Sequence, residues 1–322
     1  MNGWENNTRV LVTGASGFLG AHLVRRLLKE CTKVFVILRS GTTLFRLESV
    51  KHRLQIRFGD LCDVSSVLKI VRESRPEIVF HLAATGVNPR ERIPRSVLET
   101  NVLGTMNLLE ACRGQELHRI VHVGSCFEYG NGLDFREDQN PNPHDIYAVS
   151  KVMAWLLARM YAQHYGLPVV MLRPFTAYGP WERMDRLIPT TILHALQGRI
   201  LQVTAGEQER DWVYVEDLID GFILAASKVN VIGETINLCS GRGTPVRDVV
   251  RRALALMGDP IEVSWGAIPY REDELWRNSG NPVKAKRILG WMANTSLDVG
   301  LQRTIAWHRD NLNEIVMRMI DL

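Results

Sequence analysis

Cysteines are few, and their spacing matches neither a metal site nor a disulfide framework. Five cysteines are scattered over 322 residues, at Cys31, Cys62, Cys112, Cys126 and Cys239. An odd number without any CxxC pair argues against both a zinc site and a set of disulfides. We therefore expect no metal, and we expect most of these cysteines to be small buried side chains.

Long apolar runs and blocks of one charge are also missing. The opening stretch MNGWENNTRV has no basic region followed by an apolar one, and no later stretch is apolar for long enough to cross a bilayer. The net charge is only +4, without a Lys/Arg block interleaved with aromatic residues. These absences predict a cytoplasmic protein whose partner is neither a membrane nor a nucleic acid, and they leave room for a local basic pocket that binds phosphate.

Apolar runs rich in β-branched residues alternate with segments of helical period in the first half. With 46% hydrophobic residues the chain can bury a full-sized core. The alternation predicts a Rossmann-type α/β fold with a doubly wound parallel sheet. The expected strands are 9–14, 33–38, 53–60, 77–84, 119–125 and 168–174, and the expected helices are 18–30, 63–74, 95–113 and 146–164. We expect a dinucleotide-binding domain over 1–177 and a smaller substrate lobe over 178–322, from which about 211–240 returns to the main domain.

A glycine pattern marks the junction between the first strand and the first helix. In TGASGFLG, the glycines Gly14, Gly17 and Gly20 are spaced as GxxGxxG. Glycines at this junction let the backbone turn tightly and approach a pyrophosphate, which binds free N–H groups at the positive end of the helix. The pattern predicts dinucleotide binding by the three glycines and their neighbours Ser16, Phe18 and Leu19.

The end of the second strand bears on the choice between NAD and NADP. A carboxylate there bonds a ribose 2′-hydroxyl, whereas an arginine accommodates a 2′-phosphate. The chain has Leu38, Arg39 and Ser40 at this point. We therefore favour NADP(H) and keep NAD(H) as the alternative, with Arg39 then a solvated loop cation. After the third strand, Asp60 and Leu61 fall at the adenine end, although Asp60 is open to a second interpretation as the N-cap of the following helix.

Two residues four positions apart, Tyr147 and Lys151, share one face of an expected helix. A phenol is a poor base at neutral pH, but a neighbouring ammonium and an oxidised nicotinamide both favour the phenolate. An expected strand ends at Ser125. Its hydroxyl could form a hydrogen bond with the same substrate oxygen that Tyr147 protonates. These three residues are the candidate acid/base machinery.

With these motifs the chain resembles an extended short-chain dehydrogenase/reductase of the nucleotide-sugar epimerase/dehydratase group. The resemblance covers nearly the whole sequence, through TGASGFLG, GDLCD, FHLAA, TNVLGTMNLLEAC, VGSCFEYG, YAVSK, LRPFTAYGP, RDWVYVEDL and LGW. It implies that Ser125, Tyr147 and Lys151 form a catalytic triad and that Lys151 also holds the nicotinamide ribose. It further implies that the cofactor is lined by Leu82, Ala83 and Ala84, and that Asn101 is a structural or proton-relay residue.

The resemblance also implies a substrate site for a nucleotide-diphosphate sugar. In this group Arg210 and Arg271 would clamp the diphosphate and Glu274 would bond the nucleotide ribose, while salt bridges on the surface are the alternative for the arginines. Thr176 stands where the group usually has an asparagine, and it offers a hydrogen bond without the bidentate amide. The group commonly forms dimers, and the expected exposed side of helix 146–164 is unusually apolar, with Met153, Trp155, Leu156, Met160 and Tyr161.

Two departures from the group bear on the reaction. Sugar 4,6-dehydratases typically carry acidic residues just after the catalytic Ser/Thr, whereas this chain has Cys126 and Phe127. From that we expect 4,6-dehydration and the related decarboxylation to be disfavoured. Glu128 follows, and it is expected to point to the opposite side if the segment is extended.

Three hypotheses for the function follow. The first is an NADPH-dependent reductase of a 4-keto deoxysugar nucleotide, and the second is a nucleotide-sugar C4 epimerase that uses bound NAD. The third, a non-catalytic dinucleotide-binding sensor, is disfavoured because all three triad residues are present. A reductase of small aromatic or steroid alcohols would leave Arg210, Arg271 and Glu274 without a diphosphate.

Overall fold

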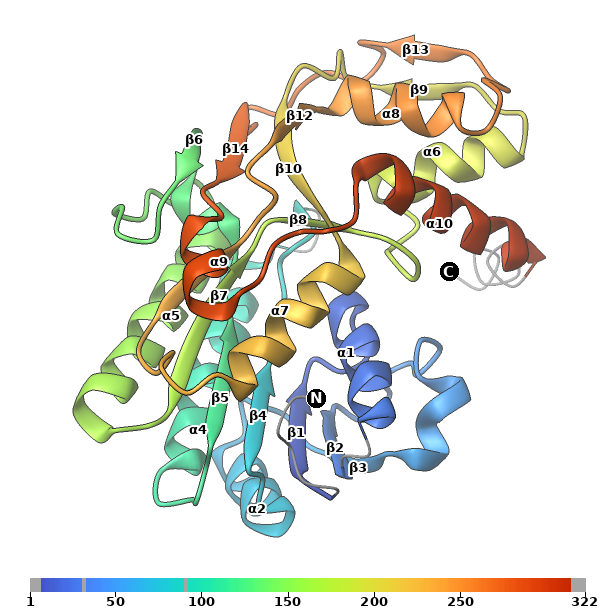
Figure 1. Ribbon diagram of the computed structural model, residues 1–322. Helices are drawn as coiled ribbons and strands as arrows, with labels where there is room; N and C mark the ends of the chain where they lie inside the picture. Colours follow the sequence, from blue (N-terminus) through green and yellow to red (C-terminus); the bar gives the residue numbers. More distant parts are fainter. Residues whose placement is uncertain (1–6, 31–32, 90–91, 314–322) are drawn as a thin grey trace.

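A parallel sheet of apolar strands, buried on both faces, forms the centre of the larger lobe. In the computed structural model, which describes residues 7–30, 33–89 and 92–313, its order is β11-β7-β5-β4-β1-β2-β3 (Figure 1). The strands are β1 (Arg9–Thr13), β2 (Lys33–Leu38), β3 (Gln55–Phe58), β4 (Ile78–His81), β5 (Arg119–Val123), β7 (Val169–Pro174) and β11 (Thr235–Leu238). The predicted Rossmann-type α/β class is confirmed.

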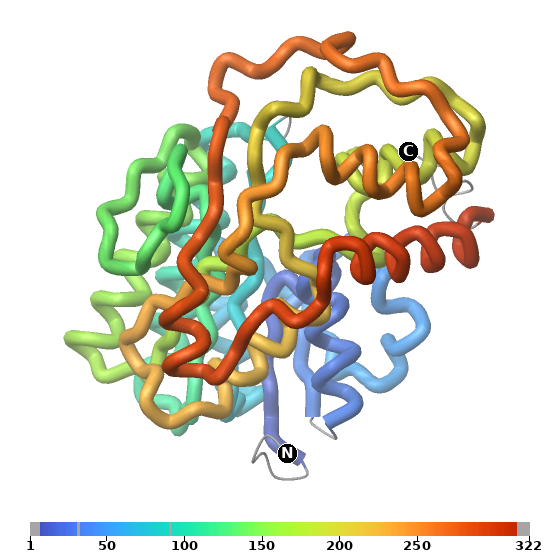
Figure 2. Tube along the Cα trace, turned by 45° about the horizontal axis from the view of Figure 1, so that its top comes forward, coloured from blue at the N-terminus to red at the C-terminus, as the bar shows by residue number. Residues whose placement is uncertain are grey.

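Helices cover both faces of this sheet because successive strand residues point to opposite sides. On β1, Val10 and Val12 belong to the cluster under α1 (Phe18–Lys29) and α7 (Val215–Ser227). These two helices lie side by side on one face of the sheet (Figures 1 and 2). Leu11, between them, belongs to the cluster of the opposite face. The helices on that face are α2 (Val64–Ser74), α4 (Gly104–Cys112) and α5 (Ile146–Tyr165).

The helix expected over 95–113 is not a single regular helix. It consists of α3 (Pro94–Leu98), a π-helical turn η3 (Glu99–Leu103) and α4. A π turn accommodates one extra residue within a helix and often accompanies a functional site. Here the turn contains Asn101, which is 2% exposed.

The apolar outer face expected on α5 is only partly present. Met153 and Leu156 are 41% and 50% exposed. Trp155, however, donates its indole N–H to the Thr235 hydroxyl at 2.9 Å, and Tyr161 is buried. Met160 also packs on the main-sheet cluster. The expectation that these three side chains are exposed is therefore wrong. More of the α5 surface packs against the main lobe than a single apolar stripe would cover.

The second lobe is smaller and has its own sheets. One sheet contains β12 (Gly243–Pro245), β10 (Glu209–Tyr214), β14 (Arg277–Gly280) and β6 (Gly132–Phe135), with β8 (Thr176–Tyr178) beside β10. The short strands β9 (Leu201–Val203) and β13 (Val263–Trp265) pair with each other. Three helices complete the lobe, namely α6 (Leu187–Leu196), α8 (Val246–Ala255) and α10 (Leu297–Asp310). A small separate core of Leu201, Val203, Val250 and Leu254 holds α8 on the β9–β13 pair.

The chain passes between the two lobes several times. β6 precedes residue 177 but pairs with β14 of the second lobe, whereas β11 and α7 follow residue 177 and belong to the main lobe, β11 as a strand of the main sheet and α7 packed on its face. Figure 2 shows the orange and red trace leaving β13, descending through α9 (Val283–Leu289) beside the main lobe and returning to α10. A site between the lobes therefore draws on residues from many parts of the sequence.

Among the described residues, no helix is both long and apolar enough to cross a bilayer. Of the cysteines, Cys112, Cys126 and Cys239 are buried and Cys62 is exposed. Cys31 lies outside the described residues.

Candidate active site

The strand order reverses between β1 and β4, which places a crevice at the carboxyl ends of these two strands. Gly14 follows β1 with a φ of +70°, a conformation that favours glycine. A Cβ atom on Gly14 would lie 2.7 Å from the backbone N of Ala83, just after β4. The first glycine is therefore required both by the turn and by the close approach of the two loops.

The other two glycines shape the start of α1. Gly17 is the N-cap of α1 and has no side-chain cap, so the helix N-terminus is open to an external acceptor. A Cβ on Gly20 would lie 2.1 Å from the Gly14 carbonyl oxygen. Ser16, Phe18 and Leu19 are half-buried around this turn. A tight, side-chain-free cradle at a helix N-terminus fits the pyrophosphate of a dinucleotide.

The expected adenine-end residues lie at the carboxyl ends of β2 and β3. Arg39 is exposed directly after β2, and its carbonyl oxygen accepts the Thr42 N–H at 3.1 Å. Asp60 follows β3 and accepts the Cys62 N–H at 2.9 Å. The N-cap of α2 is Asp63, which accepts from Ser65 and Ser66, so the N-cap interpretation of Asp60 is wrong. Leu61 is buried, and its carbonyl oxygen accepts the Asn107 amide at 2.8 Å.

A buried hydrogen-bond chain fixes the loop that contains Leu82, Ala83 and Ala84. His81 lies 2.7 Å through Nδ1 from the Thr13 hydroxyl and 2.8 Å through Nε2 from the Thr105 hydroxyl. Burial, and secondarily the Lys151 charge, lowers the pKa of His81 to about 3, so the ring is neutral. The sequence signal for this role is a histidine in an otherwise apolar run, FHLAA.

Asn101 continues this chain toward the triad helix. Its amide oxygen accepts the Thr85 N–H at 2.8 Å, and its Nδ2 donates to the Ser150 hydroxyl at 2.8 Å. Ser150 in turn donates to the Tyr147 carbonyl oxygen at 2.7 Å. Asn101 thus links the loop after β4 to the first turns of α5.

Ser125, Tyr147 and Lys151 converge beside this crevice. α5 begins immediately before Tyr147, and Asp145 caps it by accepting the Ala148 N–H at 2.8 Å. The Ser125 side chain lies close enough to Tyr147 to lower the pKa of its phenol. One turn later along α5, Lys151 donates from Nζ to the Val123 carbonyl oxygen at 2.6 Å. Tyr147 and Lys151 are 6% and 4% exposed, so the triad is largely removed from water.

Burial sets the protonation behaviour of the triad. It lowers the pKa of Lys151 to about 8, against the opposing effect of the Glu128 charge. Burial also raises the pKa of Tyr147, the neighbouring Ser125 hydroxyl lowers it, and the Glu128 and Asp145 charges raise it further. The phenol is therefore neutral and able to donate a proton. It becomes a usable base when positive charge lies close to it.

The segment after Ser125 is not extended as expected. It forms a 3₁₀ turn, η4 (Cys126–Tyr129), capped by Ser125 and Glu128 in a reciprocal capping box. Because of this turn, Glu128 folds back toward Ser125, and the expectation that it points away is wrong. Burial raises the pKa of the Cys126 thiol to about 12, and the Phe127 ring stands edge-on to Tyr147 at 6.3 Å.

The expected substrate residues also lie together, on the side of the second lobe. Arg210 of β10 donates to the Glu274 carboxylate at 2.6 Å, and Arg271 approaches the other Glu274 oxygen at 3.4 Å. Thr176 of β8 pairs with Trp212, two residues along β10 from Arg210. Glu274 and Arg210 are mostly buried, whereas Arg271 is half exposed. This charged cluster offers one carboxylate and two guanidinium groups to a ligand.

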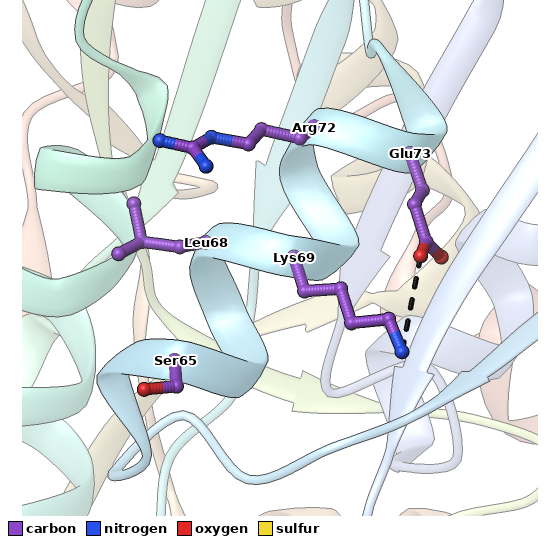
Figure 3. Close-up of a pocket in the computed structure, with 5 residues that line it drawn as sticks. All are labelled: Ser65, Leu68, Lys69, Arg72 and Glu73. Carbon is purple, nitrogen blue, oxygen red and sulfur yellow. Dashed lines mark ion pairs between the residues drawn. The ribbon is translucent and has the colours of Figure 1, made fainter.

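A surface hollow elsewhere contains none of these residues. Figure 3 shows it on α2, with the Lys69–Glu73 ion pair marked, and its lining is Ser65, Leu68, Lys69, Arg72 and Glu73. Its charged side chains come from one exposed helix face. We therefore place the candidate site at the strand ends, where the glycine loop and the triad meet.

Known proteins resemble the chain over nearly its whole length. A dTDP-glucose 4,6-dehydratase of Neisseria meningitidis serogroup B is 30% identical, and the match covers 94% of each chain. A solved UDP-glucose 4-epimerase of Thermotoga maritima, with UDP-glucose, is 28% identical with a TM-score of 0.85, over 94% of this chain and 99% of that one. A solved dTDP-glucose 4,6-dehydratase of Streptomyces venezuelae, with NAD bound, is 29% identical with a TM-score of 0.84, over 95% and 98%.

These relatives correct one expectation. From Cys126 and Phe127 we judged 4,6-dehydration to be disfavoured. That judgement is wrong, because the relatives at about 30% identity over 94% of the chain are named dTDP-glucose 4,6-dehydratases. Two residues next to Ser125 are too narrow a basis for excluding a reaction that relatives of this similarity are named for.

The resemblance found in the sequence is confirmed. The family model described as "NAD dependent epimerase/dehydratase family" matches residues 10–239. That match includes the glycine loop, the ends of β2, β3 and β4, and the whole triad. The chain therefore belongs to the NAD dependent epimerase/dehydratase family.

Proposed function

We propose that this chain is an oxidoreductase that moves a hydride between a bound nicotinamide and C4 of a nucleotide-diphosphate sugar. The net reaction we propose is NADPH-dependent reduction of a 4-keto deoxysugar nucleotide. The observation that carries the proposal is the burial of Tyr147, Ser125 and Lys151 together, at the same edge of the sheet as the glycine cradle. A buried phenol next to an ammonium is suited to proton transfer at a carbonyl oxygen.

The residues divide the chemistry between them. When bound, the nicotinamide supplies the hydride that C4 gains. Tyr147 gives its phenolic proton to the C4 oxygen, so the carbonyl becomes an alcohol and the phenol becomes a phenolate. Ser125 donates a hydrogen bond to the same oxygen while negative charge develops on it. Lys151, close behind, favours the phenolate and is positioned to hold the nicotinamide ribose.

The charged cluster supports a diphosphate-linked substrate. Arg210 and Arg271 already converge on one carboxylate, that of Glu274. A diphosphate would replace that carboxylate between the two guanidinium groups, since their forks match phosphate oxygens. Glu274 would then be available for a ribose hydroxyl, and Thr176 for a sugar hydroxyl. The Thermotoga maritima relative with UDP-glucose supports this class of substrate.

NADP(H) is the cofactor we propose, because Arg39 and not a carboxylate follows β2. A specific observation also favours a second candidate, a C4 epimerase that retains NAD. Solved neighbours include a UDP-glucose 4-epimerase of Thermus thermophilus in complex with NAD. An epimerase would use the same triad in both directions, and the keto sugar would turn over between two hydride transfers.

The first experiment is to denature the purified protein and identify any released cofactor by mass spectrometry. The protein is then assayed with NADPH plus dTDP-, GDP-, CDP- and UDP-linked 4-keto-6-deoxysugars, and separately with the corresponding unmodified hexose nucleotides. NADPH consumption with a 4-keto substrate supports the reductase. Retained NAD with interconversion of C4 epimers identifies the epimerase, and formation of a 4-keto-6-deoxy product identifies the dehydratase. If no nucleotide sugar reacts with either cofactor, the proposal fails.

We also propose a homodimer, in which Met153 and Leu156 of α5 lie in the interface because both are exposed apolar residues on one helix. Light scattering of the purified protein measures its mass. A monomer at micromolar concentration contradicts this part of the proposal. The cytoplasmic location expected from the sequence stays a prediction.

A further inference from the structure

A fully buried carboxylate lies directly behind Ser125. Glu128 is 0% exposed, and its Oε1 accepts the backbone N–H of Ser125 at 2.8 Å. Its Oε2 accepts from Nε of Arg173 at 2.7 Å, and Arg173 is itself 1% exposed. The carboxylate therefore bonds the backbone of a triad residue with one oxygen and a buried guanidinium with the other.

We propose that Glu128 is a positioning residue, which holds Ser125 in its reactive orientation through the Ser125 amide while Arg173 fixes the carboxylate. The proposal rests on the proposed function, in which the Ser125 hydroxyl bonds the reacting oxygen. Glu128 does not touch that oxygen. It acts only through the backbone and side chain of Ser125.

The capping box shows how the orientation is fixed. Glu128 accepts from the Ser125 N–H, and the Ser125 hydroxyl oxygen accepts from the Phe127 N–H at 3.2 Å. These two bonds close η4 into a ring that includes Ser125 itself. The Ser125 hydroxyl oxygen thus faces the η4 amides, and its proton remains for an acceptor on the side of Tyr147. Without the Glu128 acceptor, one of the two bonds that hold this arrangement is lost.

Arg173 anchors the carboxylate to the main sheet. It lies at the carboxyl end of β7 and also donates to the Tyr129 hydroxyl at 2.8 Å. Tyr129 donates onward to the Asn237 side chain on β11 at 2.8 Å. The chain of hydrogen bonds therefore runs from the edge strand β11 through Arg173 on β7 to Ser125. Such a rigid support keeps a reactive group within the small tolerance that catalysis requires.

Packing alone does not account for an ion pair at this position. A buried ion pair loses its solvation, and apolar side chains of similar volume often give equal or higher stability. An experiment can therefore separate a positioning role of the ion pair from a role in stability. Replacing both partners by apolar residues removes the burial cost of both charges, whereas replacing one leaves the other charge buried without a partner.

The experiment compares Glu128→Leu, Arg173→Met and the double variant in urea unfolding and steady-state kinetics. We expect each single variant to be less stable than the wild type and the double variant to regain wild-type stability. In the double variant kcat is expected to remain roughly 10- to 100-fold low, because a small misplacement of a reactive group has effects of this size. KM is expected to stay within about threefold, since the Arg210 and Arg271 groups proposed to bind the diphosphate are unchanged. If wild-type kcat returns together with stability, the proposal is wrong.

Glu137→Gln is the matched control. Glu137 also accepts a backbone N–H, that of Asn237 at 2.8 Å, but it makes no bond to Ser125. We expect its kcat to be within about twofold of the wild type. A kcat loss in Glu137→Gln equal to that of the double variant would mean that any change in this network lowers activity, which overturns the specific role of Glu128.

A second measurement does not depend on any substrate. In protein labelled with [15N]serine, the Ser125 amide resonance is assigned by its loss in Ser125→Ala. A hydrogen bond from this amide to a carboxylate shifts the amide proton downfield, and we expect an upfield change in the double variant. An unchanged resonance overturns the proposal. If wild-type protein turns over no nucleotide sugar, the proposed function fails, while the amide measurement still decides whether Glu128 holds Ser125.

Discussion

Replacing Lys151 by methionine is expected to stabilise the apo-protein at neutral pH while it abolishes activity. The Lys151 side chain is 4% exposed, and burial lowers its pKa from 10.5 to about 8. Methionine has a similar length and shape but carries no charge to desolvate. The variant therefore isolates the energetic cost of holding this ammonium in the active site.

The magnitude follows from the two pKa values. A decrease from 10.5 to about 8 corresponds to about 3 kcal/mol of destabilisation wherever lysine is protonated in both states. The substitution also removes the hydrogen bond from Nζ to the Val123 carbonyl oxygen, at a cost of about 1 kcal/mol. At pH 7 we therefore expect Lys151→Met to raise the free energy of unfolding by about 2 kcal/mol.

The same two pKa values also fix how the stability difference between the two proteins changes with pH. Between about pH 8 and 10.5 the unfolded chain keeps the Lys151 proton and the folded chain has lost it. The unfolded state then binds more protons, so wild-type stability rises with pH relative to the variant. The advantage of Lys151→Met should therefore be constant below about pH 8 and should almost vanish near pH 9.5.

Urea unfolding of both proteins without cofactor, at half-unit steps from pH 6.5 to 9.5, measures this difference. Groups that the Lys151 charge does not affect titrate alike in both proteins and cancel, and His81, whose pKa of about 3 that charge helps to lower, stays neutral over this whole range. Lys69→Met is the control, since the Lys69 side chain is 75% exposed on α2. Its difference from wild type should not change with pH. If the free energies of unfolding of wild type and Lys151→Met change with pH in parallel, the argument that burial lowers the pKa of Lys151 is refuted.

Three further changes test other parts of the site. Tyr147→Phe removes the proton donor, so kcat should fall about 100- to 10,000-fold while the cofactor Kd, measured by fluorescence titration, stays unchanged; residual activity above a tenth of wild type would exclude Tyr147 as the acid. Gly20→Ala places a Cβ 2.1 Å from the Gly14 carbonyl oxygen and should lower the free energy of unfolding, measured in urea, by about 1–3 kcal/mol. An unchanged free energy of unfolding would contradict this steric argument. Arg39→Ala should weaken NADPH about tenfold relative to NADH in calorimetric titrations, because one charge-assisted bond is lost, and an equal loss for both cofactors would argue against a 2′-phosphate contact.

Local patterns predicted the main sheet well. Five of the six expected strands are short runs rich in β-branched residues and almost fully buried, so composition and length alone identify them, whereas β3 is partly exposed. The π turn around Asn101 was missed because apolar residues recur with the same helical spacing before and after such a turn. The pairing of β6 with β14 was also missed, since it joins residues more than 140 positions apart and neither strand has a strong pattern of its own.

The triad could be found because Tyr147 and Lys151 are related by helical spacing, which the local sequence encodes. The role of Glu128 could not be found by extending the strand beyond Ser125. Its signal was nevertheless present, since SCFE has the Ser-x-x-Glu spacing of a capping box. The pairing of Arg210 with Glu274 depends on how the segment before β14 lies along β10, and no local pattern fixes that.

Three charges buried near one another explain why this part of the fold supports oxidoreduction. Lys151 and Arg173 each contribute one positive charge, and Glu128 contributes one negative charge. Glu128 raises the pKa of Lys151, and Arg173 in turn lowers that of Glu128 against the effect of burial. Each charge thus favours the ionised form of its neighbour, against the effect of burial. A protonated Lys151, one turn along α5, favours a phenolate on Tyr147 and an oxyanion on a substrate, and it acts against burial and the Glu128 and Asp145 charges, which raise the pKa of Tyr147. Because hydride transfer at a sugar carbon needs this same stabilisation in reduction, epimerisation and dehydration, the charge arrangement suits all three, and the residues that face the rest of the sugar must decide among them.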